Sequence, residues 1–263
     1  MPDLDLLIEG GFPVGKSYLV TGEQGSGKTL FCIQFILNGL LGGEKAVYVT
    51  VNEKPADIIA EANSLGWSLL KFVEEKKLLI LDASPLLSAS TNRASKSGEP
   101  DVAKTISDLA SYVKKMEASR LVIDPVDSLI GSADSSSATQ EHTRTLVHAL
   151  QDQIETTNLL TSNSFSGNSI GAAGGQGIPV NGVVVLGFSR KLNGLTRTLL
   201  VSKMRETAID LIEYSFDIVK ERGIVLNPII PEALPTPETP IMSETPAAEI
   251  PEADLSKFKE WEP

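Results

Sequence analysis

The sequence predicts an α/β fold with a mostly parallel central sheet flanked by helices and with antiparallel hairpins added at the C-terminal edge. Short segments rich in Val, Ile and Leu alternate with amphipathic segments through most of the 263 residues, a pattern typical of parallel sheets. Closer to the C-terminus, β-rich segments follow one another across short turns, which indicates hairpins. A glycine-rich stretch at residues 22–29 lies between the first strand and a long helix.

The elements before residue 84 alternate regularly. Residues 4–8 are apolar and lead into a turn rich in glycine. The first long helix ends near the glycine pair 42–43, a common C-terminal signal. Pro55 suits the first turn of the next helix. The expected strands are 17–21, 46–51 and 78–82, and the expected helices are 30–41, 55–66 and 68–76.

The rest of the predicted domain continues this pattern and then changes to hairpins. Residues 84–100 are rich in Ser, Gly and Asn and indicate a loop. Asn193-Gly194 is a favourable hairpin turn. The expected helices are 101–118 and 139–156, the expected strands are 120–124, 159–161, 183–188, 197–203, 215–220 and 223–226, and the expected loops are 131–138 and 162–181.

The chain is predicted to hold one domain, residues 1–227, and a tail, residues 228–263. The tail contains eight of the 15 prolines, with eight acidic residues against two lysines, and so carries −6 of the net charge. Such a segment buries too little apolar surface to fold, which predicts a disordered acidic tail. Apolar groups gather at residues 255–261. The tail is therefore either a solubilising segment or a docking motif for a protein partner.

Composition excludes several classes of protein. The net charge is −11, which disfavours non-specific binding to nucleic acid or to a membrane surface. Cys32 is the only cysteine, so the chain forms no internal disulfide and suits a reducing cytosol. Residues 1–5 are acidic rather than basic, unlike a signal peptide. No apolar run approaches the ~20 residues that span a bilayer. We expect a soluble, cytoplasmic protein without membrane insertion.

The stretch Gly-Glu-Gln-Gly-Ser-Gly-Lys-Thr has the Walker A spacing of a phosphate-binding loop. Its glycines let backbone N–H groups turn towards an anion, and the following helix points its positive end there. The full spacing and both flanking elements argue against a chance match. Lys28 is expected to reach the β- and γ-phosphates, and the Thr29 hydroxyl to bind Mg²⁺. The residues expected to hold the nucleotide are Gly22, Glu23, Gln24, Gly25, Ser26, Gly27, Lys28, Thr29 and Leu30.

Two carboxylates at strand ends complete the candidate site. Asp124 ends an apolar strand, where a carboxylate holds Mg²⁺ together with Thr29; its alternative role is to cap the next turn. Asp127 is interpreted as a helix cap or a loop acid rather than as a metal ligand. Glu53 follows the second strand and is the candidate that orients and deprotonates water; its alternative role is that of an exposed turn carboxylate.

Five segments carry a resemblance to a known family: the loop with Leu30-Phe31 and Gln34-Phe35, Val49-Thr50-Val51-Asn52-Glu53, Leu65-Gly66-Trp67, Leu81-Asp82-Ala83-Ser84-Pro85 and Val122-Ile123-Asp124. Over about residues 10–227 the chain resembles the KaiC-type ATPases of the RecA superfamily. The resemblance implies a single-domain member with a RecA-like fold, in which ATP and Mg²⁺ bind between the subunits of a ring that is usually hexameric. KaiC itself carries two such domains.

One departure from the family and one match to it bear on chemistry. The family has two adjacent glutamates after the second strand, where this chain has Asn52 and Glu53. An amide orients water but cannot accept its proton, so hydrolysis is expected to be slow or absent. Lys203-Met204-Arg205 matches a family Lys-x-Arg that reaches the neighbouring subunit's γ-phosphate. The alternative for Lys203 and Arg205 is a pair of solvated charges at a strand end.

The residues described above are compatible with three functions. The first is a slowly hydrolysing, oligomeric regulatory ATPase, and the second is an ATP-dependent scaffold that does not hydrolyse. The third is a recombinase-like DNA-binding ATPase, whose pore loops would correspond to residues 131–138 and 162–182. The second of these loops has no charged residue and the first has only Asp134. Because a phosphate-tracking groove needs Lys and Arg, nucleic-acid binding is not expected.

Overall fold

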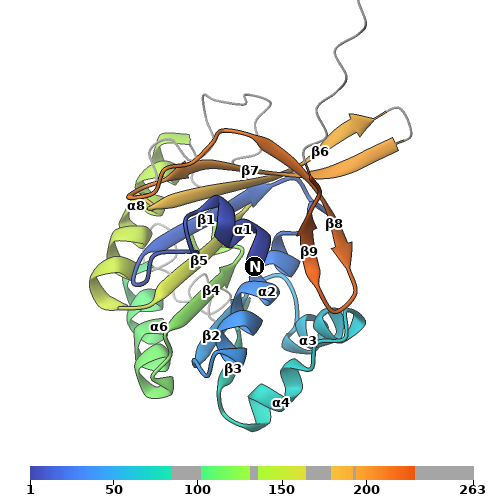
Figure 1. Cartoon of the computed structure of the whole chain (residues 1–263). Coiled ribbons are helices and arrows are strands. Elements are labelled where there is room, and N and C mark those ends of the chain that lie inside the picture. Colours follow the sequence, from blue (N-terminus) through green and yellow to red (C-terminus); the bar gives the residue numbers. More distant parts are fainter. Residues whose placement is uncertain (85–101, 131–135, 164–178, 192–193, 229–263) are drawn as a thin grey trace, which may run out of the picture. The chain divides into compact units, whose positions relative to one another are not determined.

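The computed structural model describes residues 1–84, 102–130, 136–163, 179–191 and 194–228 (Figure 1). One compact unit spans Met1–Ile229. The predicted tail lies outside the described residues except for Pro228, and so do residues 85–100 and most of the two predicted pore loops. The division into a domain and a disordered tail therefore stays a prediction.

The described strands form one nine-stranded sheet in the order β3-β2-β4-β5-β1-β6-β7-β8-β9 (Figure 1). Pairing is parallel from β3 through to β6 and antiparallel from β6 to β9. This confirms the predicted sheet with antiparallel strands at one edge. The strands are β1 Ser17–Gly22, β2 Ala46–Thr50, β3 Leu78–Asp82, β4 Arg120–Asp124, β5 Thr157–Ser162, β6 Gly182–Lys191, β7 Gly194–Met204, β8 Glu213–Val219 and β9 Gly223–Leu226.

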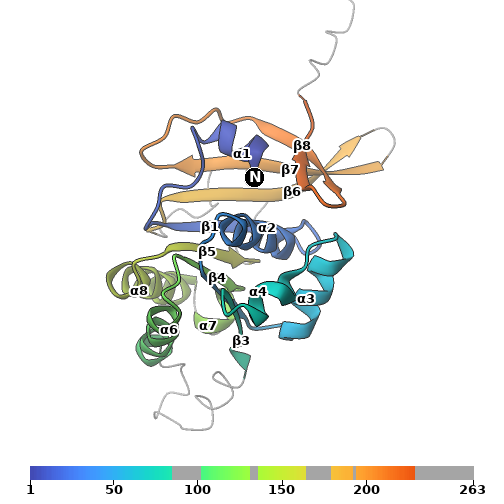
Figure 2. The ribbon, with the colours of Figure 1, turned by 60° about the horizontal axis from the view of Figure 1, so that its bottom comes forward.

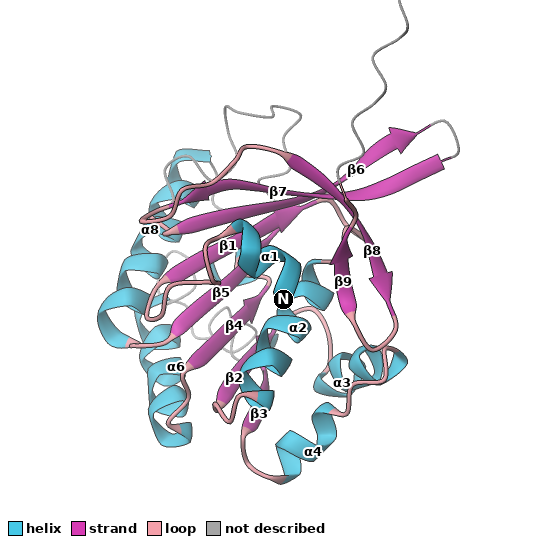
Figure 3. Cartoon of the chain, viewed as in Figure 1, coloured by secondary structure: helices cyan, strands magenta, loops and turns pink. Residues whose placement is uncertain are grey.

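Helices cover both faces of the sheet (Figures 2 and 3). The helices are α1 Pro2–Leu7, α2 Lys28–Leu41, α3 Pro55–Ser64, α4 Leu69–Glu74, α6 Val102–Met116, α7 Asp127–Ile130 and α8 Ser136–Gln153. The short helix α1 was not expected from the sequence, whereas α7 begins at Asp127, which was interpreted as a helix cap or a loop acid. Pro at the first helical turn and two acids, Asp3 and Asp5, favour α1.

Two hydrophobic clusters lie on the opposite faces of the sheet, because successive side chains of a strand point in opposite directions. Tyr18, Val20 and Tyr48 belong to the cluster that includes α2, α3 and α4. Leu19 and Val47 belong to the cluster that includes α6 and α8. The four inner parallel strands β1, β2, β4 and β5 are thus buried almost throughout, as is typical of a parallel sheet covered on both faces. The edge strand β3 is only partly buried after Leu78.

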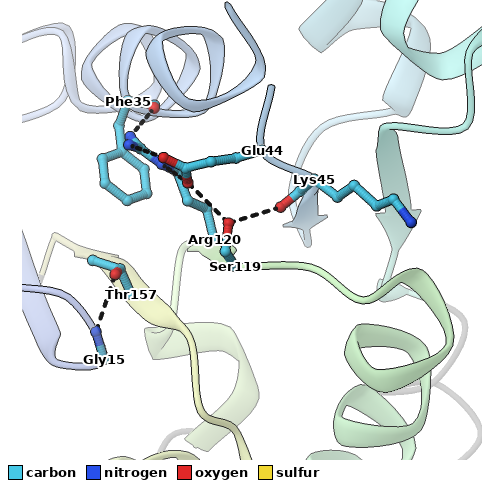
Figure 4. Close-up of polar contacts among 7 residues, drawn as sticks. All are labelled: Gly15, Phe35, Glu44, Lys45, Ser119, Arg120 and Thr157. Carbon is cyan, nitrogen blue, oxygen red and sulfur yellow. Dashed lines mark hydrogen bonds and ion pairs between the residues drawn. The ribbon is translucent and has the colours of Figure 1, made fainter. Parts of the chain in front are cut away.

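A polar network ties the C-terminal half of α2 to the start of β4 (Figure 4). Arg120 donates from Nε and Nη2 to the Glu44 carboxylate at 2.7 and 2.9 Å. Its Nη1 donates to the Phe35 carbonyl at 2.7 Å, and its guanidinium lies 4.6 Å from the centre of the Phe35 ring. The Ser119 hydroxyl also donates to Glu44, at 2.9 Å. These contacts fix the far end of the helix whose first turn follows the phosphate loop.

Candidate functional site

A cavity of about 650 Å³ opens beside the phosphate loop. It lies at the C-terminal ends of β1, β2 and β4, the edge where open parallel sheets bind ligands. The structure brings together the predicted Lys28, Thr29, Glu53 and Asp124 around it. Its lining residues are Gln24, Gly25, Gly27, Lys28, Thr29, Leu30, Thr50, Asn52, Glu53, Glu61, Ser64, Leu65, Asp124, Pro125, Asn163, Arg197 and Ile218.

The glycines of the loop are needed for two different reasons. A Cβ on Gly22 would lie 2.0 Å from the Leu186 carbonyl oxygen, so the loop passes β6 too closely for any side chain. Gly27 caps α2 with φ of 105°, a left-handed conformation that favours glycine. Because the first turn of a helix leaves its N–H groups without helical partners, the start of α2 offers backbone donors to an anion.

Lys28 is held inside the loop by backbone carbonyls. Its Nζ donates to the carbonyls of Gly22 and Glu23, each at 2.8 Å. Burial lowers the pKa of Lys28, while the negative charges of Asp124 and Asp127 oppose that shift. The two carbonyls thus hold the ammonium group of Lys28 within the loop, at the wall of the cavity.

Two hydroxyl groups hold the carboxylate of Asp124. Tyr48 donates to Oδ2 at 2.7 Å, and Thr161 donates to Oδ1. Burial, and then the charge of Asp124, raise the pKa of the Tyr48 hydroxyl well above its usual value, so this hydroxyl remains a donor at neutral pH.

The donor set of the cavity fits Mg²⁺. The Asp124 carboxylate and the Thr29 hydroxyl line the same cavity, and Mg²⁺ prefers such hard oxygen ligands. Among the described residues, no three His, Cys, Asp or Glu side chains are grouped to hold a metal. An ion here would therefore take part of its coordination from phosphate oxygens and water, which is how Mg²⁺ usually binds in nucleotide sites.

Glu53 and Asn52 follow β2 and face the same cavity. The Thr50 hydroxyl donates to the Glu53 carbonyl at 2.8 Å and so holds the turn in place. The Glu53 side chain is exposed at the mouth of the cavity. Partial desolvation, then the charges of Asp124 and Asp57, raise its pKa, which makes it a stronger base than a glutamate with the usual pKa. The Ser128 hydroxyl donates to Asn52 Oδ1 at 3.3 Å.

Glu61 of α3 is a carboxylate of this cavity that sequence reasoning missed. Burial, then Glu53 and Asp124, raise the pKa of Glu61 to about 7. A signal was present in the sequence, because Glu61 follows the buried Ile58 by three residues and so shares its helix face. Ser64 and Leu65 extend the same wall of the cavity.

Arg197 is a second missed residue, and it comes from the antiparallel part of the sheet. In β7 it pairs with Phe188 of β6, a strand that continues beyond the end of β1 and past the phosphate loop. Its Nε lies 3.4 Å from the Gly25 carbonyl oxygen, and its guanidinium lies 5.9 Å from the centre of the Phe188 ring. No local motif marks Arg197, because only the strand register brings it to the cavity.

Asp127 begins α7 and organises the end of β5. Its carboxylate accepts hydrogen bonds from the Ser162 hydroxyl at 2.6 Å and from the Asn163 backbone N–H at 2.7 Å. Because Asn163 lines the cavity, Asp127 positions a wall of the site.

Comparisons with known proteins decide the family. A family model described as "ATPase: KaiC" matches residues 1–230. The chain belongs to the KaiC family of ATPases. It is 36% identical over 226 residues to the circadian clock oscillator protein KaiC of Synechococcus elongatus, covering 86% of this chain and 43% of that protein. It is 28% identical over 229 residues to the circadian clock protein KaiC3 of Synechocystis, covering 87% and 45%.

A solved member of the family supports the same fold. The crystal structure of a KaiC-like protein from the hyperthermophilic archaeon Pyrococcus horikoshii matches with a TM-score of 0.69 and 33% identity, covering 85% of this chain and 94% of that one. The predicted resemblance and the RecA-like fold are thereby confirmed. The chain spans less than half of the length of the cyanobacterial KaiC proteins, at 43% and 45%. Membership of this family implies ATP binding.

Two of the predicted site residues of this KaiC-family chain, Lys203 and Arg205, lie away from the cavity. The Arg205 N–H donates to the Asn181 carbonyl at 2.7 Å, and the Asn181 N–H donates to the Ser17 carbonyl at 2.7 Å. Ser17 begins β1 and the phosphate loop follows its end, so about 17 Å of strand separates them. Burial, then the charge of Arg205, lower the pKa of Lys203. Within one chain, these cations cannot complete the cavity.

The helices in the part of the chain that the structure describes are not of the membrane-crossing kind. None of the helices there combines the length and the apolar character that crossing a bilayer requires.

Proposed function

We propose that this chain is an ATP-binding, slowly hydrolysing, oligomeric regulatory ATPase, with Mg²⁺ as cofactor and with ATP at subunit interfaces. The observation that carries the proposal is the cavity in which the phosphate loop, Glu53 and Asp124 meet. Its walls supply a cation and backbone donors for phosphate, hard oxygen ligands for a metal and a base for water.

Each group has a distinct part in the proposed reaction. Lys28 and the backbone N–H groups of the loop bind the β- and γ-phosphates. Thr29 and Asp124 would hold Mg²⁺, which when bound neutralises phosphate charge. Glu53 orients the water that attacks the γ-phosphate and accepts its proton, and a pKa above the usual value of a glutamate favours that task. Asn52 beside it offers an amide, which explains why turnover is expected to be slow.

The assembly follows from the position of the two distant cations. Lys203 and Arg205 belong to the opposite end of β1 from the phosphate loop. We propose that they act on the ATP of a neighbouring subunit in a ring, usually hexameric, where they offset charge developing on the phosphate. Burial first, and then the charge of Arg205, lower the pKa of Lys203, and a phosphate bound beside the two cations would favour the charged form of both.

Phosphate release by the purified full chain tests the hydrolytic role. With ATP and Mg²⁺ we expect slow turnover that falls at least tenfold in Glu53→Gln, because general base catalysis typically contributes ~10²–10⁴-fold. Glu74→Gln, an exposed acid on α4 outside the cavity, is the matched control and should release phosphate at the wild-type rate. Equal rates in the two variants would exclude Glu53 as the base.

Light scattering after size exclusion tests the assembly. Adding ATP and Mg²⁺ should convert the chain into a hexamer, whereas a monomer that ignores nucleotide would count against the trans contact. Lys28→Ala, which removes the phosphate-binding cation, should lose the conversion.

Asn52 motivates a second candidate, a scaffold that binds ATP without hydrolysing it. Nucleotide binding and assembly with no phosphate release from the assembled ring would favour this candidate over the first. The remaining proposals concern the whole molecule: a cytoplasmic protein without membrane insertion, with no nucleic-acid partner, whose tail at residues 228–263 contacts a protein partner.

A further inference from the structure

The carboxylate of Asp124 is held from both sides by strands that flank β4. Tyr48 pairs with Val122 across β2 and β4, two residues before Asp124 on the same face of the sheet. On the other side, Thr161 lies in β5, which is the parallel neighbour of β4. Their hydroxyls donate to different oxygens of the carboxylate. Both residues are buried, with 1% and 0% of their surfaces exposed.

Two hydrogen bonds to two oxygens fix the rotation of a carboxylate. An ionised carboxylate has about four lone-pair positions, and the two hydroxyls occupy one on each oxygen. The remaining lone-pair positions are available to a ligand, because Asp124 lines the cavity and is 8% exposed. Hydrogen bonds to a charged group are stronger than bonds between neutral groups, so this rotation is set before any ligand arrives.

We propose that Tyr48, together with Thr161, is a positioning residue that fixes the Asp124 carboxylate for nucleotide-bound Mg²⁺. This inference rests on the proposed function, since it assumes that Asp124 serves Mg²⁺. Partners that orient a metal ligand typically contribute 10–100-fold in metal affinity. Without the hydroxyls of Tyr48 and Thr161, the Asp124 carboxylate would be free to rotate and would have to be ordered when Mg²⁺ binds. Its buried oxygens would also lack hydrogen-bond donors, which is energetically costly for a charged group.

The alternative role of the two hydroxyls is only to satisfy a buried carboxylate. That role affects folding stability and leaves the response to Mg²⁺ unchanged. The distinguishing quantity is therefore the Mg²⁺ concentration that half-saturates the tight binding of a fluorescent ATP analogue to the full-length chain. The same titration in EDTA measures metal-independent nucleotide binding.

In Tyr48→Phe the half-saturating Mg²⁺ concentration should rise about tenfold, while nucleotide binding in EDTA should stay within about twofold. Tyr18→Phe is the matched control, because Tyr18 is also 1% exposed but its hydroxyl donates to the Pro13 carbonyl at 2.8 Å. This control should leave the Mg²⁺ response unchanged.

Thr161 supplies an independent test that does not require Tyr48→Phe to fold. Thr161→Val removes the hydroxyl at nearly constant volume and should raise the half-saturating Mg²⁺ concentration, whereas Thr161→Ser keeps the hydroxyl and should restore it. A Mg²⁺ response that is unchanged in both Tyr48→Phe and Thr161→Val overturns this inference alone. If the wild-type chain does not bind the ATP analogue, the proposed function fails and the inference fails with it.

Discussion

Gly39 of α2 lies against the guanidinium of Arg120, so closely that a Cβ on Gly39 would come within 2.3 Å of Arg120 Nε. The network in Figure 4 therefore requires glycine in the last turn of α2, although glycine within a helix is intrinsically unfavourable by roughly 0.5–1 kcal/mol relative to alanine.

Gly39→Ala should destabilise the chain when residue 120 is Arg and should stabilise it when residue 120 is Ala. In the wild-type chain the new methyl group displaces Arg120 from Glu44, and we expect a loss of about 1–3 kcal/mol in the free energy of unfolding. In an Arg120→Ala background the clash is gone, so Gly39→Ala should add about 0.5–1 kcal/mol through helix propensity.

A double-mutant cycle followed by urea unfolding measures this coupling. Gly39→Ala effects of the same sign in both backgrounds would show that the contact does not restrict residue 39. Gly42→Ala, at the end of α2, serves as a comparison because its nearest contact, at 3.3 Å, is the Gly39 carbonyl rather than Arg120.

Glu61→Gln should stabilise the empty chain at high pH and much less at low pH. The pKa of Glu61 is raised from 4.5 to about 7, so its neutral form is favoured by folding. The contribution of the protonated Glu61 side chain to the free energy of unfolding is fully present below pH ~4.5 and is lost as the pH rises through 7. Because Glu61 is partly exposed, we expect a gain of only about 1–2 kcal/mol at pH 8.5 relative to pH 5.

Urea unfolding in EDTA without nucleotide, at pH 5 and pH 8.5, measures the difference between Glu61→Gln and the wild type. Glu74→Gln controls for the loss of a negative charge, since Glu74 is exposed and outside the cavity. A stability difference that is the same at both pH values for Glu61→Gln would contradict the raised pKa.

Gly22→Ala and Gly25→Ala should differ strongly although they lie in one loop. A Cβ on Gly22 meets the Leu186 carbonyl at 2.0 Å, whereas a Cβ on Gly25 meets nothing within 4 Å. Gly25→Ala therefore adds only the strain of a positive φ, roughly 1–2 kcal/mol. Gly22→Ala adds a backbone clash and should lower the melting temperature further. Thermal unfolding of the two variants without nucleotide compares them, and equal melting temperatures would remove the steric argument.

Mixing two inactive variants tests the trans contact. Lys28→Ala lacks the phosphate-binding cation and Arg205→Ala lacks the distant one, so each alone should release little phosphate. In a mixed ring, some interfaces join the intact loop of one variant to the intact Arg205 of the other. Lys28→Ala chains do not assemble alone, but their intact Arg205 can still meet the ATP-loaded loop of the other variant. After the two variants are mixed and ATP is added, phosphate release should therefore recover to about a quarter of the wild-type rate, if chains assort at random.

The control for this mixture is Lys28→Ala with Glu53→Gln. Lys28 and Glu53 line the same cavity of one chain. Every cavity in a mixture of these two variants therefore lacks one of the two side chains. Recovery in this control, or none in the Lys28→Ala and Arg205→Ala mixture, would argue against the contact between subunits.

The local signals in the sequence predicted the parallel part of the fold and the core of the cavity. Strand bounds such as 78–82 and 120–124 agree with β3 and β4, because short runs of Leu, Ile and Val are typical of strands whose two faces pack against a core. The spacing of residues 22–29 predicted the loop, since its chemistry depends on consecutive backbone positions. Glu53 and Asp124 were found because residues at the ends of parallel strands share one edge of the sheet.

Residues brought to the cavity by register or by a helix face were missed. Arg197 reaches Gly25 only because β7 pairs with a long β6, and strand pairing across a sheet leaves no local mark in the sequence. The role of Tyr48 was also hidden, because its hydrogen bond to Asp124 joins residues 76 positions apart. A buried tyrosine in a strand looks like an ordinary core residue until its hydroxyl has a partner.

The phosphate loop and Arg205 lie at opposite ends of β1. Because of this polarity, the number of complete ATP sites equals the number of interfaces between neighbouring chains. Under the proposed trans contact, a single chain has no complete site. An open row of n chains has n − 1, because its last loop faces solvent. Only a closed ring gives every chain one complete ATP site. The ATPase activity per chain should therefore rise with the number of chains in the assembly and reach its plateau when the ring closes.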